Sequence, residues 1–412
     1  MTAYRPREIL PALQNALRNM PVVALSGLRQ TGKTTLLRND PSFAERRYAT
    51  FDDFATLEQA RRSPEAFLEG ETPLTIDEVH KCPQILEVIK LDVDRRRRPG
   101  RFLLSGSSNL ALMKGSCDSL AGRIVHLDLH PFSRREIAGT TKEAPYLPEF
   151  FRSCKAGKTS PARRAGHPVT SAEIVRGGMP SVALGEADTP AIWFRGFEQT
   201  WLERDLRDLA RIDDLPAFRT LVAVAALRSG QILNASALAR DCKLAERTAN
   251  RHLHVLEQSG LVHLLQPWLG NRLNRLIKSP KLYFADSGIA AHLAGVSASA
   301  GEPDEPMRGA LFETWIHQNL KSILEAHWPE ARLHYWNIQG RHEVDFVIEA
   351  GRDTLALEVK AATRWSDPDL SGLRAFLSAT PRCVGAALVH NGTESIKLGE
   401  KLWAIPAALA VA

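Results

Sequence analysis

The chain begins with a helical pattern that leads into a series of short apolar runs. Apolar positions at helical spacing in residues 7–19 predict a helix, and the apolar run at residues 21–27 predicts a buried strand that ends in glycine. Further runs at residues 73–77, 101–106 and 123–129 predict strands of the same kind. Because helical stretches separate these strands, the pattern indicates an α/β fold. Its parallel sheet would be covered by helices on both faces and would bind a ligand at the carboxyl ends of the strands.

The chain is long enough for several units, since 412 residues correspond to about two to four domains of ordinary size. A loop rich in Gly, Ser, Pro and Arg at residues 155–168 is expected to be exposed, and the stretch VSASAGEPDEP is the best candidate for a linker. The expected units are an α/β core at 1–136, a helical lid or connector at 137–228, a third unit at 229–300 and a small α/β domain at 305–412.

Composition and charge exclude some classes of protein. Hydrophobic residues make up 44% of the chain and charged residues 24%, as in folded soluble proteins, so extensive disorder is excluded. The net charge is +6 and arginine is clustered, as at residues 95–98, which suits nucleic acid as a partner but equally suits solvated loops. The five scattered cysteines form no zinc-ligand spacing, and neither a signal sequence nor an apolar run of about 20 residues is present. We expect a cytoplasmic protein without a membrane partner.

The segment GLRQTGKT follows the first apolar strand, precedes a helical pattern and matches the phosphate-binding loop motif G-x-x-x-x-G-K-[ST]. Gly27 and Gly32 let backbone N–H groups approach phosphates, Lys33 reaches the β and γ oxygens, and the Thr34 hydroxyl is a ligand for Mg²⁺. The expected cofactors are therefore ATP and Mg²⁺. The residues expected to contact the nucleotide are Gly27, Leu28, Arg29, Gln30, Thr31, Gly32, Lys33, Thr34 and Thr35.

Two later strand ends supply candidates for the chemistry. Asp77 ends the second apolar strand, where it would help to hold the magnesium ion, and Glu78 is the candidate base for the attacking water. Ser107 and Ser108 follow the third strand and could orient the water or contact the γ-phosphate. Acidic pairs and small polar residues are also common at exposed strand ends. The neighbouring phosphate-binding loop is what favours the catalytic interpretation.

These segments resemble those of the AAA+ ATPases: GLRQTGKTTLL is similar to Walker A, LTIDEVH to Walker B and LLSGSSN to sensor 1. The resemblance implies that Arg123, in SLAGR, is an arginine finger acting on the nucleotide of a neighbouring subunit, and hence a homo-oligomer. Local pairing of this arginine at the start of a strand is the alternative.

More narrowly, the chain resembles bacterial and archaeal ATP-binding proteins that carry a C-terminal domain of unknown function, domain of unknown function 4143. The matching phrases run through nearly the whole chain and include IDEVHKCP, GGMPS, TWLERDLRDLA, KLYFADSG and FETWI. The loop at residues 155–168 is an insertion relative to that pattern, and no clear sensor 2 arginine is present.

Residues 233–265 indicate a winged helix-turn-helix, in which a short helix, a turn and a longer helix precede an apolar strand. Ala249, Leu253 and Leu256 share one face of the longer helix, and the opposite face could enter a major groove of DNA. The alternative is a solvated polar face on a module that packs against the ATPase. The candidate DNA-contacting residues are Arg247, Asn250, Arg251 and His254.

The C-terminal segments HEVDFVIE and LALEVK resemble the core of the PD-(D/E)xK nucleases. A short turn between the two strands would bring Asp345 opposite Glu358, while Glu358 and Lys360 face the same side of their strand. With Glu313, which the resemblance adds from the preceding helix, the two carboxylates would hold one or two Mg²⁺ ions, and Lys360 would stabilise the attacking hydroxide. A hairpin with charged residues on its exposed face is the alternative.

Three functions are compatible with these features. The leading hypothesis is an ATPase that couples hydrolysis to the binding or processing of DNA. The second is an ATP-dependent regulatory switch or scaffold that acts on a protein partner and carries a catalytically inactive nuclease-like domain. The third is a metal-dependent DNA nuclease gated by ATP.

Overall fold

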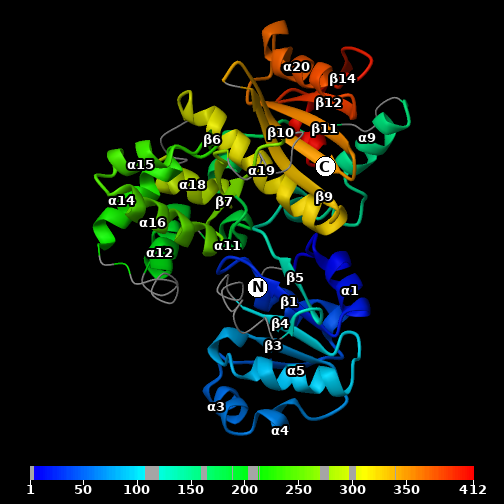
Figure 1. The fold of residues 1–412 in the computed structure, drawn as a ribbon, viewed down its shortest axis with the longest axis vertical. Helices are drawn as coiled ribbons and strands as arrows, with labels where there is room; N and C mark the ends of the chain where they lie inside the picture. Colours follow the sequence, from blue (N-terminus) through cyan, green and yellow to red (C-terminus); the bar gives the residue numbers. More distant parts are fainter. Residues whose placement is uncertain are drawn as a thin grey trace.

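The computed structural model describes residues 4–106, 120–158, 165–187, 189–202, 212, 214–269, 278–296, 303–338 and 340–412. An N-terminal α/β unit, a helical unit with a small sheet, and a C-terminal unit built on a larger sheet make up the chain (Figure 1). Among the described helices, none combines the length and the apolar character needed to cross a membrane.

The N-terminal unit is built on a parallel sheet, as predicted. Its strand order is β2-β3-β4-β1-β5, so β4 lies between the strand that precedes the phosphate-binding loop and the strand that ends in Asp77. The edge strand β2 was not predicted, because its sequence RYAT contains no apolar run. The strands are β1 (Val22–Ser26), β2 (Arg47–Thr50), β3 (Leu74–Asp77), β4 (Phe102–Ser105) and β5 (Ile124–Asp128).

Helices cover both faces of this sheet. Because side chains alternate along a strand, Val22 and Ala24 pack with one group of helices, and Val23 and Leu25 pack with the other. The first group is α3 (Phe54–Arg62), α4 (Pro64–Leu68) and α5 (Ile85–Arg95), and the second is α1 (Leu10–Asn19) and α2 (Lys33–Asn39).

The segment expected to form one lid or connector is divided between two units. Helix α9 (Tyr146–Lys155) packs on the C-terminal sheet: Phe150 lies edge-on to Trp403 with ring centroids 5.3 Å apart, and Tyr146 N–H donates to the Ala412 carbonyl oxygen at 2.7 Å. The other helices of this segment are α8 (Arg134–Ala138), α10 (Ser171–Arg176), α11 (Pro180–Ala183), α12 (Pro190–Thr200) and α14 (Leu215–Ala226).

The helical unit contains a small antiparallel sheet in the order β6-β8-β7. Helix α14 packs against α15, α16 and α18, and this core continues without a break into the C-terminal unit. The remaining elements are β6 (Gln231–Ile232), α15 (Ala235–Asp241), α16 (Glu246–Gln258), β7 (Val262–Leu265), β8 (Lys281–Phe284) and α18 (Ser287–Leu293).

The C-terminal unit is a mixed sheet in the order β13-β14-β12-β11-β10-β9. Strands β11, β12 and β14 run parallel, and the other neighbours are antiparallel. The elements are α19 (Met307–His327), β9 (Ala331–Ile338), β10 (His342–Ala350), β11 (Asp353–Lys360), α20 (Ser371–Ala379), β12 (Cys383–His390), β13 (Ile396–Lys397), β14 (Leu402–Pro406) and α21 (Ala407–Ala410).

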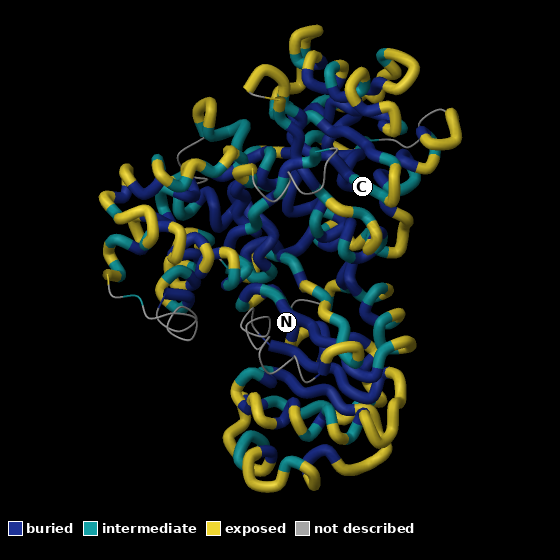
Figure 2. Tube along the Cα trace, in the orientation of Figure 1, coloured by how far each residue is buried: buried dark blue, intermediate teal, exposed yellow. Residues whose placement is uncertain are grey.

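The long helix α19 lies where the three units meet, and buried segments continue from unit to unit there (Figures 1 and 2). Gln318 Nε2 donates to the Phe132 carbonyl oxygen at 3.1 Å, and Asn319 Oδ1 accepts from Arg134 N–H at 2.7 Å. Gln318 Oε1 also accepts from Ser287 N–H at 3.0 Å. These polar side chains are almost fully buried, so α19 joins the C-terminal sheet to both other units.

Candidate functional site

The phosphate-binding loop connects β1 to α2 and has a backbone shape that requires glycine. Gly27 has φ +150°, and a Cβ atom there would lie 2.4 Å from the Leu129 carbonyl oxygen. Gly32, at the start of α2, has φ +92°. Both positions disfavour any residue with a side chain, and the loop can therefore turn its backbone toward a bound phosphate.

Lys33 and Thr34 begin α2 and lie beside the end of β3. Lys33 Nζ donates to the carbonyl oxygens of Gly27 and Leu28, at 2.8 Å each. Thr34 Oγ1 donates to Asp77 Oδ2 at 2.6 Å, and Asp77 is buried. The structure thus brings together the hydroxyl and the carboxylate expected to serve magnesium, which prefers oxygen ligands.

Glu78 follows β3 with φ +56°, a left-handed backbone that costs a non-glycine residue about 1–3 kcal/mol. Its side chain lines the same cavity as Lys33 and Thr34, and its Oε2 lies 3.1 Å from His80 Nδ1. Burial raises the pKa of the Glu78 carboxyl, Lys33 opposes the rise and Asp77 adds to it. A carboxylate with a raised pKa is a better proton acceptor for water than an exposed one.

The cavity at the loop has a volume of about 410 Å³. Besides the predicted residues, its walls include Leu36 of α2, Phe132, an N-terminal segment and a segment that includes the end of the phrase GGMPS. Gly178 N–H of that phrase donates to Asp286 Oδ2 at 2.6 Å, which ties this wall to the start of α18. The added wall residues are Tyr4, Arg5, Arg7, Leu36, Phe132, Pro180, Ser181, Leu184 and Glu186.

Arg7 lines this cavity and also supports the loop through hydrogen bonds, and the sequence analysis missed it. Its Nη1 donates to the Thr31 carbonyl oxygen and its Nη2 to the His130 carbonyl oxygen, both at 2.6 Å, while Nε lies 2.8 Å from Glu136 Oε1. No local pattern marks such a residue, because these partners lie 24 to 129 residues away along the chain.

Of the other residues predicted to act in ATP hydrolysis, the structure describes Arg123 but not the two serines. Ser107 and Ser108 lie outside the described residues. Arg123 immediately precedes β5, at the opposite end of the sheet from the loop, and its Nε lies 2.5 Å from Asp94 Oδ1. This is the local pairing given above as the alternative, and action on a neighbouring subunit remains a proposal.

Helix α16 has the two faces that its sequence predicts. Ala249, Leu253 and Leu256 are buried, and the four candidate DNA-contacting residues are exposed. The exposed residues are Arg247, Asn250, Arg251 and His254.

The predicted C-terminal side chains lie near one another. Strands β10 and β11 pair Phe346 with Leu357, which places Asp345 beside Glu358, and Asp345 Oδ2 accepts from Val359 N–H at 2.9 Å. Lys360 Nζ, on the same strand as Glu358, lies 3.8 Å from Glu358 Oε1. Burial raises the pKa of Glu358 well above its usual value, and the charge of Asp345 adds to the rise.

Lys281 of β8, which the sequence analysis did not single out, occupies the centre of this cluster. Its Nζ lies 3.0 Å from Glu313 Oε1, 3.0 Å from Asp345 Oδ1 and 2.5 Å from Glu343 Oε1, and its side chain is only 2% exposed. Tyr283, also of β8, donates a hydrogen bond to Glu313. Burial lowers the pKa of Lys281, but the charge of Glu313, followed by those of Tyr283 and Asp345, more than offsets this and raises it well above its usual value.

The C-terminal carboxylates do not fit a metal ion as they are placed. The ammonium of Lys281 supplies the positive charge between Glu313 and Asp345 that a metal would otherwise supply. Across the part of the chain that the structure describes, no group of three or more His, Cys, Asp or Glu side chains is arranged to hold a metal.

Stability should depend on pH through Glu313. Burial and the charge of Asp345 raise its pKa from 4.5 to about 7, although Lys281 opposes the rise. Since the folded state then binds more protons than the unfolded state, stability should fall as the pH rises from about 5 to 7, by up to about 1.4 kcal/mol per pH unit. Urea unfolding across this range should show a shallower pH dependence for Glu313→Gln. The exposed Glu330→Gln should behave like the unaltered protein, and identical slopes for all three would contradict the prediction.

Family models match three separate parts of the chain. Residues 19–138 match an AAA domain, residues 170–300 match a domain of unknown function (DUF8612), and residues 308–410 match a domain of unknown function (DUF4143). The expected combination of an AAA-type P-loop domain with domain of unknown function 4143 is therefore confirmed.

Two mycobacterial proteins resemble almost the whole chain. These are the uncharacterized proteins Rv2008c of Mycobacterium tuberculosis and Mb2031c of Mycobacterium bovis, each 29% identical over 404 residues, which cover 97% of this chain and 83% of the relative. Among solved structures, the Walker-type ATPase PABY2304 of Pyrococcus abyssi is 16% identical with a TM-score of 0.42, over 69% of this chain and 94% of that one. The Holliday junction branch migration motor RuvB of Thermotoga maritima is 18% identical with a TM-score of 0.29, over 62% of this chain and 87% of that one.

Proposed function

We propose that the protein binds ATP with Mg²⁺ at the phosphate-binding loop and hydrolyses it. The proposal rests on the arrangement of side chains where the loop meets the sheet. Thr34 Oγ1 donates a hydrogen bond to Asp77 Oδ2 at 2.6 Å, and Glu78 lines the same cavity as Lys33. A hydroxyl, a carboxylate, an ammonium and a candidate base therefore surround the place where a γ-phosphate would lie.

Each side chain has a separate task in this proposal. Thr34 and Asp77 would hold Mg²⁺, which neutralises charge on the phosphate oxygens when bound. Lys33 exchanges its bonds to the loop carbonyls for bonds to the phosphate, and Glu78 accepts a proton from the attacking water. Ser107 or Ser108 would orient that water, and Arg123 would act on the nucleotide of a neighbouring copy.

We further propose that hydrolysis is coupled to DNA binding through α16. A winged helix-turn-helix is supported by the antiparallel sheet and by the order of elements, which is α14, β6, α15, α16, β7, β8. The exposed face of α16 carries two arginines. Arginine, asparagine and histidine side chains on one helical face suit the phosphates and base edges of a major groove.

The coupling is tested by ATP turnover and DNA affinity at several salt concentrations. Duplex DNA should raise the rate of ATP hydrolysis, and the affinity should fall steeply with salt. Arg247→Ala and Arg251→Ala should each reduce the slope of log affinity against log salt by about 1, whereas the exposed Arg219→Ala should not. Turnover without DNA stimulation, together with no DNA binding at low salt, would leave the ATPase proposal standing and reject the coupling.

A second candidate function is an ATP-dependent switch whose C-terminal unit is a catalytically silent scaffold for a protein partner. Lys281 is the observation that favours it, because an ammonium between Glu313 and Asp345 takes the place where a nuclease would need a metal ion. The order α19, β9, β10, β11, α20, β12 still supports a nuclease-like fold. The switch predicts slow hydrolysis that DNA does not change and no DNA cleavage in Mg²⁺ or Mn²⁺.

A further inference from the structure

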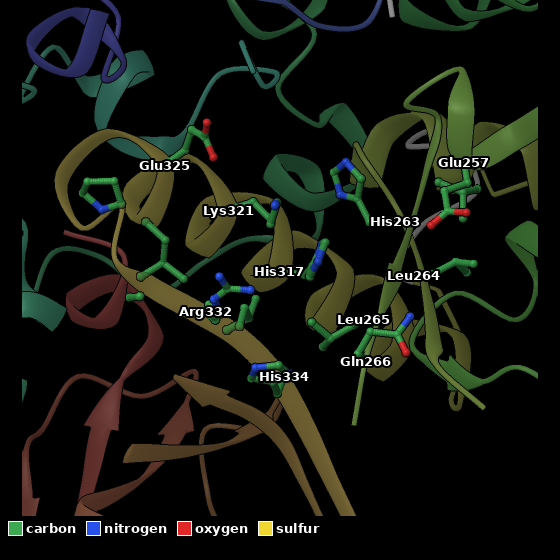
Figure 3. Close-up of a pocket in the computed structure, with 15 residues that line it drawn as sticks. Glu257, His263, Leu264, Leu265, Gln266, His317, Lys321, Glu325, Arg332 and His334 are labelled. Atoms are coloured by element: carbon green, nitrogen blue, oxygen red, sulfur yellow. The ribbon is translucent and has the colours of Figure 1, made fainter. Parts of the chain in front are cut away.

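A polar cavity of about 450 Å³ lies between α19, β7 and β9, apart from the phosphate-binding loop (Figure 3). Its volume falls in the range of about 300–1,000 Å³ that small-molecule sites usually have. Walls come from the helical unit and from the C-terminal unit, so the cavity belongs to neither alone.

Two histidines on the wall have ring nitrogens that lack a partner. His317 is 1% exposed, and its Nδ1 forms no hydrogen bond with any described residue; Nδ1 of His263 is likewise buried and unbonded within the described part. The ring of His317 stacks on Tyr283 at 4.3 Å with an interplanar angle of 6°, which fixes its plane. Buried polar atoms normally have partners, and leaving one without costs about 1–3 kcal/mol. Because both Nδ1 atoms are buried, a molecule in the cavity would contact other atoms of the two rings.

Two cations face the same cavity from different elements. Lys321 lies one helical turn beyond His317 on α19, and Arg332 lies on β9 (Figure 3). Neither cation has a carboxylate oxygen of a described residue within 4.0 Å, although Glu325 and Glu257 also line the cavity. Burial lowers the pKa of His317 and of His263, so both rings are neutral and each carries one N–H donor. The cavity is therefore rich in hydrogen-bond donors, and its two cations are balanced in formal charge by the two carboxylates.

The carboxylates lie toward opposite ends of the cavity, with Lys321 and His317 between them (Figure 3). Glu325 and Glu257 repel a second anionic group and accept hydrogen bonds from hydroxyl or amino groups. A molecule with one anionic centre and neutral polar arms complements this arrangement. A planar guanidinium, an ammonium and two imidazole N–H groups offer more donors than a carboxylate can use, which favours the three oxygens of a phosphate.

We propose that this cavity binds a small phosphorylated sugar or nucleotide, whose phosphate lies between Lys321, Arg332 and the imidazoles of His317 and His263. The ligand would also contact the wall of a smaller cavity of about 160 Å³, since His263 and Glu257 line both. That second cavity reaches Gly27 and Leu28 at the back of the phosphate-binding loop.

The test uses the full chain carrying Lys33→Ala, so that phosphates do not bind at the loop. Calorimetry and thermal unfolding with ribose 5-phosphate, AMP and inorganic phosphate are compared with ribose and adenosine. At least one phosphorylated organic probe should bind and raise the unfolding temperature, inorganic phosphate should bind more weakly, and the uncharged probes should not bind. Binding of inorganic phosphate alone would show an anion site without the proposed recognition of a sugar or nucleotide and would overturn the proposal.

Substitutions inside and outside the cavity show whether the phosphorylated probe binds there. Lys321→Met and Arg332→Gln should each weaken it about tenfold or more, since each removes a charge-assisted hydrogen bond. Arg308→Met on α19 and Arg341→Gln after β9 should leave it unchanged, because neither lines the cavity. Both cavity positions are at least partly exposed, so the variants are expected to fold, which the unfolding temperature without probe checks. Equal binding by Lys321→Met, Arg332→Gln and the parent, or no binding of any phosphorylated probe, would reject the site.

Discussion

Replacing Glu78 by glutamine is expected to lower the turnover number for ATP hydrolysis by about 10²–10⁴-fold, the usual contribution of a general base. The substitution keeps the size of the side chain but removes its ability to accept a proton from water. Because Lys33, Thr34 and Asp77 are untouched, ATP should still bind with nearly unchanged affinity. Phosphate release in the steady state and calorimetric titration with ATP measure the two quantities separately.

Two further variants make this result specific. Lys33→Ala should weaken binding as well as turnover, since the ammonium contacts the phosphate in both the ground state and the transition state. The exposed Glu71→Gln, just before the start of β3, should change neither. Undiminished turnover in Glu78→Gln would mean that another group accepts the proton, and the assignment of Glu78 would be wrong.

Replacing Lys281 by methionine is expected to lower the free energy of unfolding by about 3–5 kcal/mol. Methionine fills most of the same volume, so the loss is electrostatic: Glu313, Glu343 and Asp345 would face one another without the ammonium that now lies within 3.0 Å of each. Urea or thermal unfolding of the full chain at neutral pH measures the change.

The matched control is Lys278→Met, which alters an exposed lysine just before the same strand and should have little effect. Combining Lys281→Met with Glu313→Gln should recover part of the lost stability, because one of the uncompensated carboxylates is then removed. If Lys281→Met proved as stable as Lys278→Met, the ammonium would contribute nothing to the stability of the fold and the prediction would be wrong.

Local patterns were sufficient to predict the nucleotide-binding part. The strand, loop and helix around Gly27, Lys33 and Thr34 are contiguous in sequence, and parallel strands necessarily bring Asp77 to the same edge of the sheet. The faces of α16 were likewise predictable, since a helix repeats every 3.6 residues whatever packs against it. Strand β2 was missed because it is short and lies at the edge, where polar residues are tolerated.

Features that depend on contacts between residues far apart in the chain could not be predicted from local sequence patterns. Lys281 lies 32 residues from Glu313 and 64 from Asp345, and its position in an apolar strand indicated no charge pairing. The docking of α9 on the C-terminal sheet depends on Phe150 meeting Trp403, which no periodicity indicates. The cavity beside His317 arises only where three elements converge.

Helix α19 begins directly after the linker that divides the sequence, yet it is the element that ties the units together. A fragment that starts there would lack Phe132 and Arg134, so the buried Gln318 and Asn319 side chains would lose these partners and be exposed to water. A fragment that stops before it would expose the apolar core shared with α18. The boundary most visible in the sequence is therefore a poor place to divide the protein, and the chain should gain and lose its structure there as one cooperative body.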